Sequence, residues 1–228
     1  MPTAMRRERE RLRGLYAVTP ESADTEQLVG RVRACIAGGA TLVQYRAKSA
    51  GGALALMQAR ALVETCRPAG IPLIVNDSIE LASAVGADGV HLGRDDVSAR
   101  EARIALPDAL IGISCYADPA RALSAARDGA DYVGIGSMYP SATKPGAVRA
   151  TLASLAAARE AGGLPVAAIG GITTENAPAL VAAGADMLAV VSSLFDAPDV
   201  RATAARFAAL YPSLPAGRPD VRSQPRPV

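Results

Sequence analysis

The amino-acid sequence predicts a single (β/α)8 barrel of the TIM-barrel class, with a short polar N-terminal extension and a Pro-rich C-terminal tail. Three observations support this prediction. Short apolar runs alternate with helical patterns eight times, and eight strand–helix units are the number that closes a parallel barrel. Half of the 228 residues are hydrophobic but only 4% are aromatic, so Val, Ile, Leu and Ala must build the core, which suits parallel strands beneath helices. A turn motif that begins with Gly-Ala also recurs along the chain.

Each strand is predicted where a short apolar run stands between turn residues. The expected strands cover residues 15–19, 41–45, 72–75, 89–92, 110–113, 132–135, 165–169 and 187–191. A helical pattern follows each strand, at residues 25–37, 52–67, 79–85, 98–106, 119–127, 149–161, 174–182 and 200–210. The first helix ends at Gly38-Gly39, as helix C-termini prefer. Such strict alternation favours a parallel sheet.

The turn motif stands between a helix and each even-numbered strand. Its four copies are Gly39-Ala40-Thr41, Gly86-Ala87-Asp88, Gly129-Ala130-Asp131 and Gly184-Ala185-Asp186. Glycine ends the helix, and the next two residues begin the strand. This recurrence indicates four similar quarters and favours a closed barrel, with an open doubly wound sheet as the alternative.

We expect the barrel to occupy residues 14–211, between a charged extension at 1–13 and a disordered tail at 212–228. The tail carries five prolines and no apolar period. The two ends together hold eight Arg and three acidic residues, so the body carries −3 of a net charge of +2. An acidic body argues against nucleic-acid binding. No apolar run is long enough to span a membrane, and the start lacks the apolar core of a secretory signal.

Cysteine and histidine usage excludes two kinds of site. Cys35, Cys66 and Cys115 are far apart and the only histidine is His91, so a zinc site is not expected. Reduced thiols fit a cytoplasmic protein. No candidate nucleophilic triad is found, because Cys115 has no histidine beside it in the sequence. We interpret His91, inside a predicted strand, as a structural residue or one that supports the site, rather than as a catalytic acid–base group.

Active sites of such barrels lie at the carboxyl ends of the strands. The turns at the opposite end are short, so the two ends differ chemically, and we place the candidate site at the carboxyl end. The polar and small residues that follow the strands there are Gln44, Arg46, Lys48, Asn76, Asp77, Gly93, Arg94, Asp95, Asp96, Ser114, Ser141, Thr143, Lys144, Gly170, Gly171, Ser192 and Ser193.

Carboxylates from neighbouring loops suggest a metal. Asp77 and Asp96 are oxygen ligands of the kind that holds Mg²⁺ together with substrate phosphates. Asp95 is an equal candidate on sequence alone. The alternative role for these residues is to cap the helices that follow them.

Cations and hydroxyls at the same end suggest a phosphorylated ligand. Arg46, Lys48 and Lys144 bring three positive charges, which favours a diphosphate. Ser141 and Thr143 stand beside Lys144 in a loop of small residues, where a ligand can approach the backbone. An ordinary strand-to-helix loop is the alternative interpretation of that segment.

Five runs of this sequence resemble thiamine phosphate synthases, and the likeness extends in order over about residues 15–210. The runs are Val43–Lys48, Ile74–Asp77, Ala87–Gly93, Asp131–Gly136 and Ala168–Ile172. The resemblance implies a transferase of thiamine biosynthesis. It would join 4-amino-2-methyl-5-hydroxymethylpyrimidine diphosphate to 4-methyl-5-(2-hydroxyethyl)thiazole phosphate and release diphosphate. It also implies Mg²⁺ as cofactor and a dissociative mechanism, in which C–O cleavage gives a pyrimidine methylene cation that the thiazole nitrogen captures.

The resemblance further implies roles for individual residues. Asp77 and Asp96 would bind Mg²⁺. Arg46, Ser114 and Lys144 would be catalytic, with Ser114 and Lys144 holding the diphosphate. The substrate-binding set would be Gln44, Tyr45, Arg46, Ala47, Lys48, Asn76, Ser114, Ser141, Ala142, Thr143, Lys144, Gly171, Val191 and Ser192. The members assigned to the thiazole phosphate would be Ser141, Thr143, Gly171, Val191 and Ser192.

The sequence departs from the family pattern at Tyr45 and Ala47, where Leu and Glu are usual, and at Ala142, where Lys is usual. Many members carry Thr-His where this chain has Cys115-Tyr116. Two alternatives stay open: a related thiazole tautomerase, whose members use a histidine after the fifth strand, and a non-catalytic barrel that binds phosphorylated thiamine precursors. The expected partners are small-molecule substrates, with no nucleic acid and no membrane. The sequence leaves homo-oligomerisation open.

Overall fold

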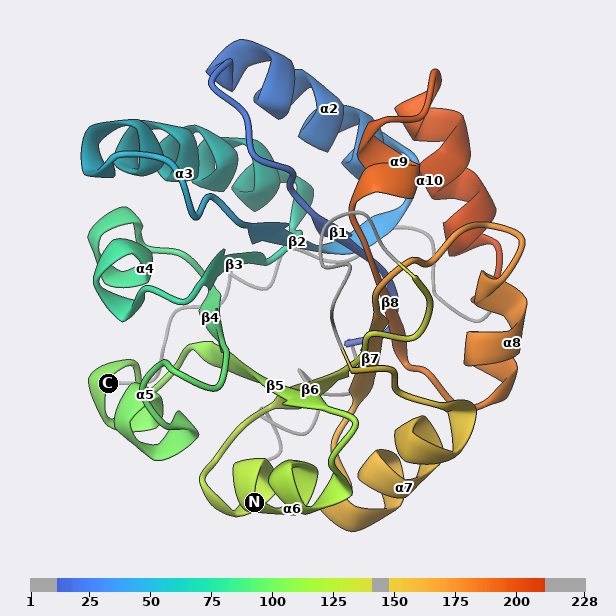
Figure 1. Ribbon diagram of the computed structural model, residues 1–228. Helices are drawn as coiled ribbons and strands as arrows, with labels where there is room; N and C mark the ends of the chain where they lie inside the picture. Colours follow the sequence, from blue (N-terminus) through green and yellow to red (C-terminus); the bar gives the residue numbers. More distant parts are fainter. Residues whose placement is uncertain (1–11, 141–147, 212–228) are drawn as a thin grey trace.

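The computed structural model describes residues 12–140 and 148–211, which form a closed barrel of eight parallel strands (Figure 1). The strands pair in chain order, and β8 pairs with β1 to close the ring. They are β1 (Gly14–Val18), β2 (Ala40–Tyr45), β3 (Leu73–Asn76), β4 (Gly89–Leu92), β5 (Leu110–Tyr116), β6 (Tyr132–Ile135), β7 (Val166–Ile169) and β8 (Met187–Val190). The predicted barrel is confirmed, and the open doubly wound sheet is excluded.

The helices surround the strands as an outer layer (Figure 1). They are α2 (Thr25–Ala37), α3 (Gly52–Cys66), the 3₁₀ turn η1 (Arg67–Ala69), α4 (Ile79–Val85), α5 (Ala99–Ala105), α6 (Pro119–Arg127), α7 (Leu152–Gly162), α8 (Ala177–Ala182), α9 (Ser192–Phe195) and α10 (Val200–Ala208). Within the described residues, none of these helices is both long and apolar enough to cross a membrane.

Two differences from the sequence prediction bear on the site, whereas other bounds shift by a few residues, such as the later starts of α7 and α8. β5 continues to Tyr116 instead of ending at residue 113, because Tyr116 still pairs with Ile135 of β6 beyond an irregularity after Ser114. The short helix α9 follows β8 directly, where only a polar strand exit was expected. Both differences place carboxyl-end residues on regular elements rather than on free loops.

Side-chain caps fix the first turns of several helices. Ser78 accepts a hydrogen bond from the backbone N–H of Leu81 at the start of α4. Ser98 does the same for Glu101 at the start of α5, in a capping box. Each such cap contributes about 1 kcal/mol to helix stability. The helices after β3 and β4 are therefore capped by serines, which leaves the nearby aspartates available for another role.

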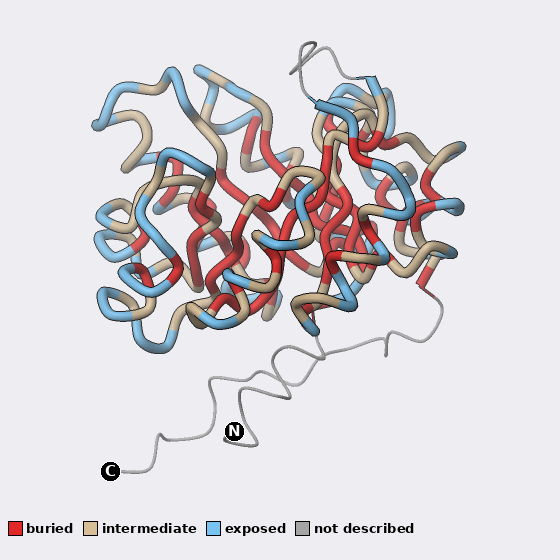
Figure 2. Tube along the Cα trace, turned by 60° about the horizontal axis from the view of Figure 1, so that its bottom comes forward, coloured by how far each residue is buried: buried red, intermediate tan, exposed pale blue. Residues whose placement is uncertain are grey.

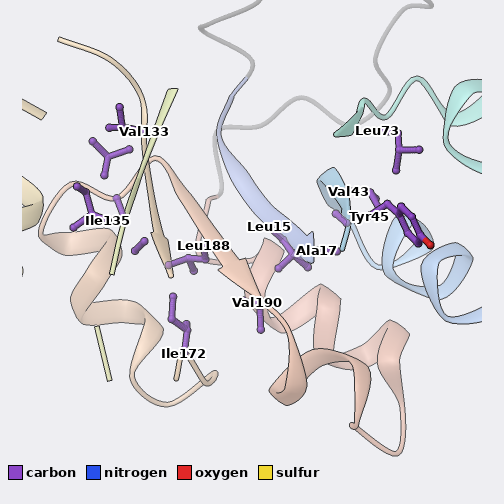
Figure 3. Packing of buried hydrophobic residues seen from close by; sticks show 14 of the residues in the cluster. Leu15, Ala17, Val43, Tyr45, Leu73, Val133, Ile135, Ile172, Leu188 and Val190 are labelled. Atoms are coloured by element: carbon purple, nitrogen blue, oxygen red, sulfur yellow. The ribbon is translucent and has the colours of Figure 1, made fainter. Parts of the chain in front are cut away.

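Alternation along the strands divides the core into two layers. Leu15 and Ala17 of β1 point outward and pack under the helices together with residues such as Val190 (Figure 3). Tyr16 and Val18 of the same strand point into the barrel. Figure 2 shows the buried segments gathered in the middle of the molecule, with exposed segments on the outer sides of the helices and in the loops. The inward layer is the one that meets the carboxyl-end site.

The recurring turns fasten the amino ends of the strands. An aspartate carboxylate in three of the turns accepts a backbone N–H of the preceding odd-numbered strand at 2.9 Å, from Leu73 to Asp88, from Ile111 to Asp131 and from Val166 to Asp186. An arginine that precedes this strand donates to the glycine carbonyl of the same turn, from Arg67 to Gly86, from Arg103 to Gly129 and from Arg159 to Gly184. The first copy has Thr41, whose hydroxyl donates to the carbonyl of Leu15 instead. We call these three units the Asp–Arg turns.

Candidate active site

A cavity of about 370 Å³ opens at the carboxyl end of the barrel, and all eight strands contribute to its wall. Apolar parts of the wall come from Val18, Ala167, Ile169 and Ala189. Neutral hydrogen-bonding groups between apolar walls suit a small ligand that contains a ring. The polar side chains in the lining are Tyr16, Gln44, Arg46, Asn76, His91, Ser114, Tyr116, Ser137, Thr173, Ser192 and Ser193.

The structure brings most of the described residues predicted from the sequence to this end of the barrel. Those that line the cavity are Gln44, Arg46, Asn76, Ser114, Gly171, Val191 and Ser192. Those that form an adjoining charged group are Lys48, Asp77 and Asp96. Those that lie outside the described residues are Ser141, Ala142, Thr143 and Lys144.

Tyr45 and Ala47 are not brought to the cavity. Gln44 of β2 points into the barrel, so its neighbour Tyr45 points outward, toward the helices. The Tyr45 hydroxyl donates to Oε1 of Gln58 in α3 at 2.8 Å, and only 2% of Tyr45 is exposed (Figure 3). Ala47 packs against the same outer core. The side chain of Tyr45 thus joins β2 to α3 instead of lining the ligand cavity.

A group of two carboxylates and one ammonium stands beside the cavity. Nζ of Lys48 lies 3.0 Å from Oδ2 of Asp77, and Oδ2 of Asp96 accepts the N–H of Gly93 at 2.6 Å. Burial raises the pKa of Asp96, and the hydrogen-bonded Asp77 carboxylate raises it further. The Gly93 N–H and Lys48 lower this pKa, but they do not cancel the rise. Asp77 has a left-handed backbone (φ 64°), which turns the chain sharply at the end of β3. Asp96, and not the exposed Asp95, makes these contacts.

The donor chemistry of this group fits Mg²⁺. Two adjacent carboxylates repel each other, and a divalent cation held by them would offset the repulsion that contributes to the raised pKa of Asp96. The described residues contain no group of three or more His, Cys, Asp or Glu side chains that could hold a metal ion. A pair of carboxylates is nevertheless enough for Mg²⁺, which keeps several waters and takes further oxygens from substrate phosphates.

The loop after β2 is held in place by the loop after β1. Glu21 accepts the N–H of Lys48 at 2.7 Å and the hydroxyl of Ser49 at 2.7 Å, and it lies 3.8 Å from the Arg46 guanidinium. Burial would raise the pKa of Glu21, but the hydrogen bonds from Ser49 and Lys48 outweigh it and lower the pKa. Thr19 also accepts the N–H of Arg46 at 2.9 Å. These contacts fix the segment that carries both Arg46 and Lys48.

Hydrogen bonds connect five inward side chains across the barrel, directly beneath the ligand space. Nε2 of Gln44 lies 2.6 Å from the Tyr16 hydroxyl, which lies 2.7 Å from the Tyr132 hydroxyl. The Tyr132 hydroxyl is 3.1 Å from Nδ1 of His91, and Nε2 of His91 is 2.9 Å from Oγ of Ser114. We call this set the cross-barrel chain. It ends at two residues, Gln44 and Ser114, for which the family resemblance of the sequence implies substrate contacts.

The loop after β7 needs glycine at a close approach of two chain segments. Gly171 has a left-handed backbone (φ 62°), and a β-carbon on it would overlap the carbonyl oxygen of Pro140. The side-chain amide of Asn176 donates to the Gly171 carbonyl at 3.0 Å, and the Tyr139 N–H donates to the Gly170 carbonyl at 2.9 Å. The Gly170-Gly171 loop is therefore packed tightly against residues 139–140 at the cavity wall.

Several functional candidates were missed by the sequence reasoning. Tyr16 and Tyr132 lie within predicted strands, where their alternation toward the barrel interior was the available signal. Glu21 follows the first strand, the one exit for which no residue was proposed. The ring of Tyr116 lines the cavity and stacks with the guanidinium of Arg94, whose carbon lies 4.7 Å from the ring centre. An isolated tyrosine or glutamate has no motif that marks it in a sequence.

Comparisons with known proteins agree with this geometry. A family model described as thiamine monophosphate synthase matches residues 15–194. Thiamine-phosphate synthases from Azoarcus sp. and Thiobacillus denitrificans are each 55% identical over 89% of this chain, covering 98% and 96% of those proteins. Among solved structures, the thiamine phosphate pyrophosphorylase from Pyrococcus furiosus superposes with a TM-score of 0.80 at 34% identity, over 89% of this chain and 96% of that one. The chain therefore belongs to the thiamine monophosphate synthase family and is a transferase.

Proposed function

We propose that this protein condenses hydroxymethylpyrimidine diphosphate with hydroxyethylthiazole phosphate to give thiamine phosphate and diphosphate. The observation that carries the proposal is the joint placement, at one end of the barrel, of a cavity walled by neutral amides and apolar side chains and of the Lys48–Asp77–Asp96 group. A substrate that combines an uncharged ring with a diphosphate needs both features side by side. Family membership supports the same assignment.

The cavity supplies the groups that would recognise the pyrimidine ring. Gln44, the last residue but one of β2, and Asn76, the last residue of β3, present neutral amides to the ligand space. Amides can donate to ring nitrogens or accept from an exocyclic amino group. The apolar side chains of Val18 and Ile169 complete a slot for the flat ring. These residues would hold the carbon that loses the diphosphate in a fixed position.

The diphosphate would lie toward the charged side of the site. Arg46 lines the cavity and Lys48 is next to it, and both are fixed by Glu21. Asp77 and Asp96 would hold Mg²⁺, which when bound offsets the negative charge that develops on the leaving group. Ser114 would donate a hydrogen bond to the same group, together with Lys144, which lies outside the described residues. Cations and donors aimed at the leaving oxygen lower the barrier to C–O cleavage.

The lining of the described cavity also suits a cationic intermediate. Its residues include no carboxylate and no thiol, so no group there would trap a carbocation by forming an ester or thioether. Cys115 is fully buried next to the site, and burial raises the pKa of its thiol to about 12. A thiol with such a pKa is not ionised at neutral pH and is a weak nucleophile. The site would thus leave the cation free of capture by a carboxylate or a thiolate before the thiazole nitrogen reacts.

The thiazole phosphate would bind on the side of β7 and β8. Gly171, Val191 and Ser192 line the cavity there and offer backbone N–H groups and a hydroxyl. This is the part of a TIM barrel that frequently binds phosphate. Ser141 and Thr143 are proposed as its further contacts and lie outside the described residues.

The direct test is to mix the purified protein with both substrates and Mg²⁺ and to measure diphosphate release. We expect release only when both substrates are present, and loss of release when a chelator removes Mg²⁺. Binding of the thiazole phosphate without any turnover would instead favour a non-catalytic barrel. Isomerisation of the thiazole phosphate without the pyrimidine substrate would favour a tautomerase. The proposed cytoplasmic location and the oligomeric state are separate questions for fractionation and for gel filtration with light scattering.

A further inference from the structure

The cross-barrel chain has a defined place beneath the ligand space. Gln44, Tyr16, His91 and Ser114 line the cavity, while Tyr132 is fully buried below them. Along the series from Gln44 through Tyr16, Tyr132 and His91 to Ser114, the side chains come from β2, β1, β6, β4 and β5. The cross-barrel chain therefore runs from one side of the barrel to the other. Every link is within hydrogen-bond distance, between 2.6 and 3.1 Å. Such a continuous series constrains which atom of each pair carries the hydrogen.

The first link has a fixed direction, and we assign the direction of the second from it. Nε2 of Gln44 belongs to an amide NH₂ group, which only donates, so the Tyr16 oxygen accepts. The Tyr16 hydroxyl hydrogen is then available for the Tyr132 oxygen. Burial raises the pKa of both phenols, so both keep their hydrogens at neutral pH. In this assignment Tyr132 accepts from Tyr16 and directs its own hydrogen elsewhere.

The remaining links follow from the first two. The Tyr132 hydroxyl donates to Nδ1 of His91, so that nitrogen carries no hydrogen. A neutral imidazole without a hydrogen on Nδ1 carries it on Nε2. Nε2 therefore donates to Oγ of Ser114. Because Ser114 accepts from His91, its own hydroxyl hydrogen is left to point into the cavity.

The backbone keeps room for this arrangement. A β-carbon on Gly112 of β5 would overlap both the Tyr132 ring and Nδ1 of His91. The Tyr132 and His91 rings lie with centres 5.5 Å apart, and the Tyr132 and Tyr16 rings meet edge to face at 5.9 Å. Glycine at this strand position thus permits the contact between Tyr132 and His91. The imidazole is held on both sides and has little freedom to rotate.

We propose that His91 is a positioning residue, which Tyr132 holds as the Nε2–H tautomer so that the Ser114 hydroxyl faces the cavity as a hydrogen-bond donor. A donor in that position serves an anionic leaving group. The opposite direction of the chain would put the hydrogen on Nδ1 and turn the Ser114 hydrogen toward His91, as in a serine that is being activated as a nucleophile. The role of Ser114 toward diphosphate rests on the proposed function, whereas the tautomer does not.

The tautomer can be measured without any substrate, because the chain has a single histidine. Untagged protein labelled with ¹⁵N-histidine gives one imidazole in a long-range ¹H–¹⁵N spectrum, and we expect the Nε2–H pattern at about pH 8, above the ordinary histidine pKa. An Nδ1–H pattern would overturn the proposal. Tyr132→Phe removes the hydroxyl that holds Nδ1, so we expect both nitrogen signals to move toward a mixture of tautomers. An unchanged spectrum in this variant would also overturn it.

Tyr211→Phe is the matched control. It also removes one hydroxyl from a buried tyrosine, but this hydroxyl donates to the Ala185 carbonyl at the opposite end of the barrel. We expect the imidazole spectrum and the turnover of Tyr211→Phe to match the parent protein. A change in its imidazole signals equal to that of Tyr132→Phe would mean that general loosening, and not the hydrogen bond, moves the spectrum.

Kinetics test the consequence for catalysis. We expect His91→Leu to lower kcat for diphosphate release by about tenfold or more, with KM for the pyrimidine diphosphate changed by less than about threefold, because the donor acts mainly on the leaving group. His91→Gln keeps an N–H that can reach Ser114 and should recover most of kcat. Equal losses in both variants would overturn the positioning role. An Nε2–H imidazole in a protein without turnover would support the tautomer and overturn the proposed function instead.

Discussion

At the scale of single residues, we expect a substitution of Asp96 to have opposite effects on stability and on activity. Burial is the largest cause that raises the pKa of Asp96, and the neighbouring Asp77 carboxylate raises it further. Without a metal ion, the two ionised carboxylates therefore repel each other and destabilise the folded protein. We expect Asp96→Asn to raise the melting temperature measured without Mg²⁺, because it removes the like charge. We expect the same variant to lower Mg²⁺-dependent kcat/KM by roughly 100-fold, since one of two metal ligands is lost.

Asp95→Asn is the control for this variant, because it removes the same charge from the adjacent, exposed residue. It should change neither the melting temperature nor the turnover appreciably. If Asp95→Asn lost as much activity as Asp96→Asn, the assignment of the metal ligand to Asp96 would be wrong. The sequence left these two carboxylates equivalent, and only their side-chain contacts distinguish them.

Glu21 is expected to act on the site through the loop that it holds. Glu21→Gln weakens the contacts to Lys48, Ser49 and Arg46, so we expect kcat/KM to fall by about tenfold, the scale of a misplaced binding group. The pKa of Glu21 is lowered in the folded protein. Its stabilisation is therefore complete above the ordinary Glu pKa of about 4.3 and is lost as the pH falls through the lowered value.

Two measurements check this expectation. The difference in melting temperature between the parent and Glu21→Gln should be largest at neutral pH and should vanish on acidification. Glu64→Gln, on the exposed side of α3, should show neither the kinetic nor the pH-dependent effect. A Glu21→Gln enzyme with unchanged kcat/KM would mean that the loop keeps its position without the carboxylate.

At the scale of elements, the Asp–Arg turns locate stability at the end opposite the site. Asp131 is 4% exposed, accepts the Ile111 N–H at 2.9 Å and lies 2.6 Å from Arg103. Asp131→Ala leaves a largely buried guanidinium and a strand N–H without this partner, so we expect a loss of about 3 kcal/mol in unfolding free energy. Denaturant unfolding measures this loss, and activity per folded molecule should be unchanged.

The matched comparison is Asp128→Ala, which breaks an exposed pair with Arg100 at 3.1 Å. Exposed pairs contribute about 0–1 kcal/mol, so this variant should be nearly as stable as the parent. Similar losses in the two variants would contradict a special role for the Asp–Arg turns. A large loss of activity in folded Asp131→Ala would show that the two ends of the barrel are coupled.

The same turns show what an element-level pattern can and cannot predict. The recurring Gly-Ala-Asp signal correctly placed the junctions between helices and even strands, because a helix end and a strand start need fixed residue types. It did not reveal the arginines, which come from 19 to 26 residues earlier in the chain. Likewise, Ser114 was predicted as a strand exit, but pairing with β6 makes it part of β5. Partners that are distant in sequence leave no local periodicity.

At the scale of the whole molecule, the order of elements and the inequality of the barrel ends were predictable. Alternating strands and helices leave few topologies, and parallel strands bring all eight carboxyl ends to one face. That reasoning places Gln44, Asn76 and Ser114 together at one end of the barrel, and the structure brings all three to the cavity. It could not find the cross-barrel chain, because inward tyrosines such as Tyr16 serve equally as ordinary core residues. Position relative to the cavity, and not residue type, gives them a role.

The two ends of the described chain lie at the face of the barrel opposite the cavity. Tyr211 is 2% exposed, its hydroxyl donates to the carbonyl of Ala185 in the turn before β8, and the Arg13 guanidinium lies over its ring. Residues 212–228 lie outside the described ranges, as does most of the predicted extension at 1–13. Figure 2 shows both ends of the described chain on the same side of the molecule.

This geometry predicts that deletion of residues 213–228 leaves kcat/KM within about twofold of the full chain, because the described chain ends at the face opposite the cavity. Steady-state kinetics of the truncated protein measure this. A longer deletion, of residues 209–228, also removes Tyr211 and should cost roughly 3 kcal/mol of unfolding free energy, as expected when a buried aromatic side chain is lost. A large loss of turnover in the shorter deletion, with stability unchanged, would mean that the tail reaches around the barrel to the active site.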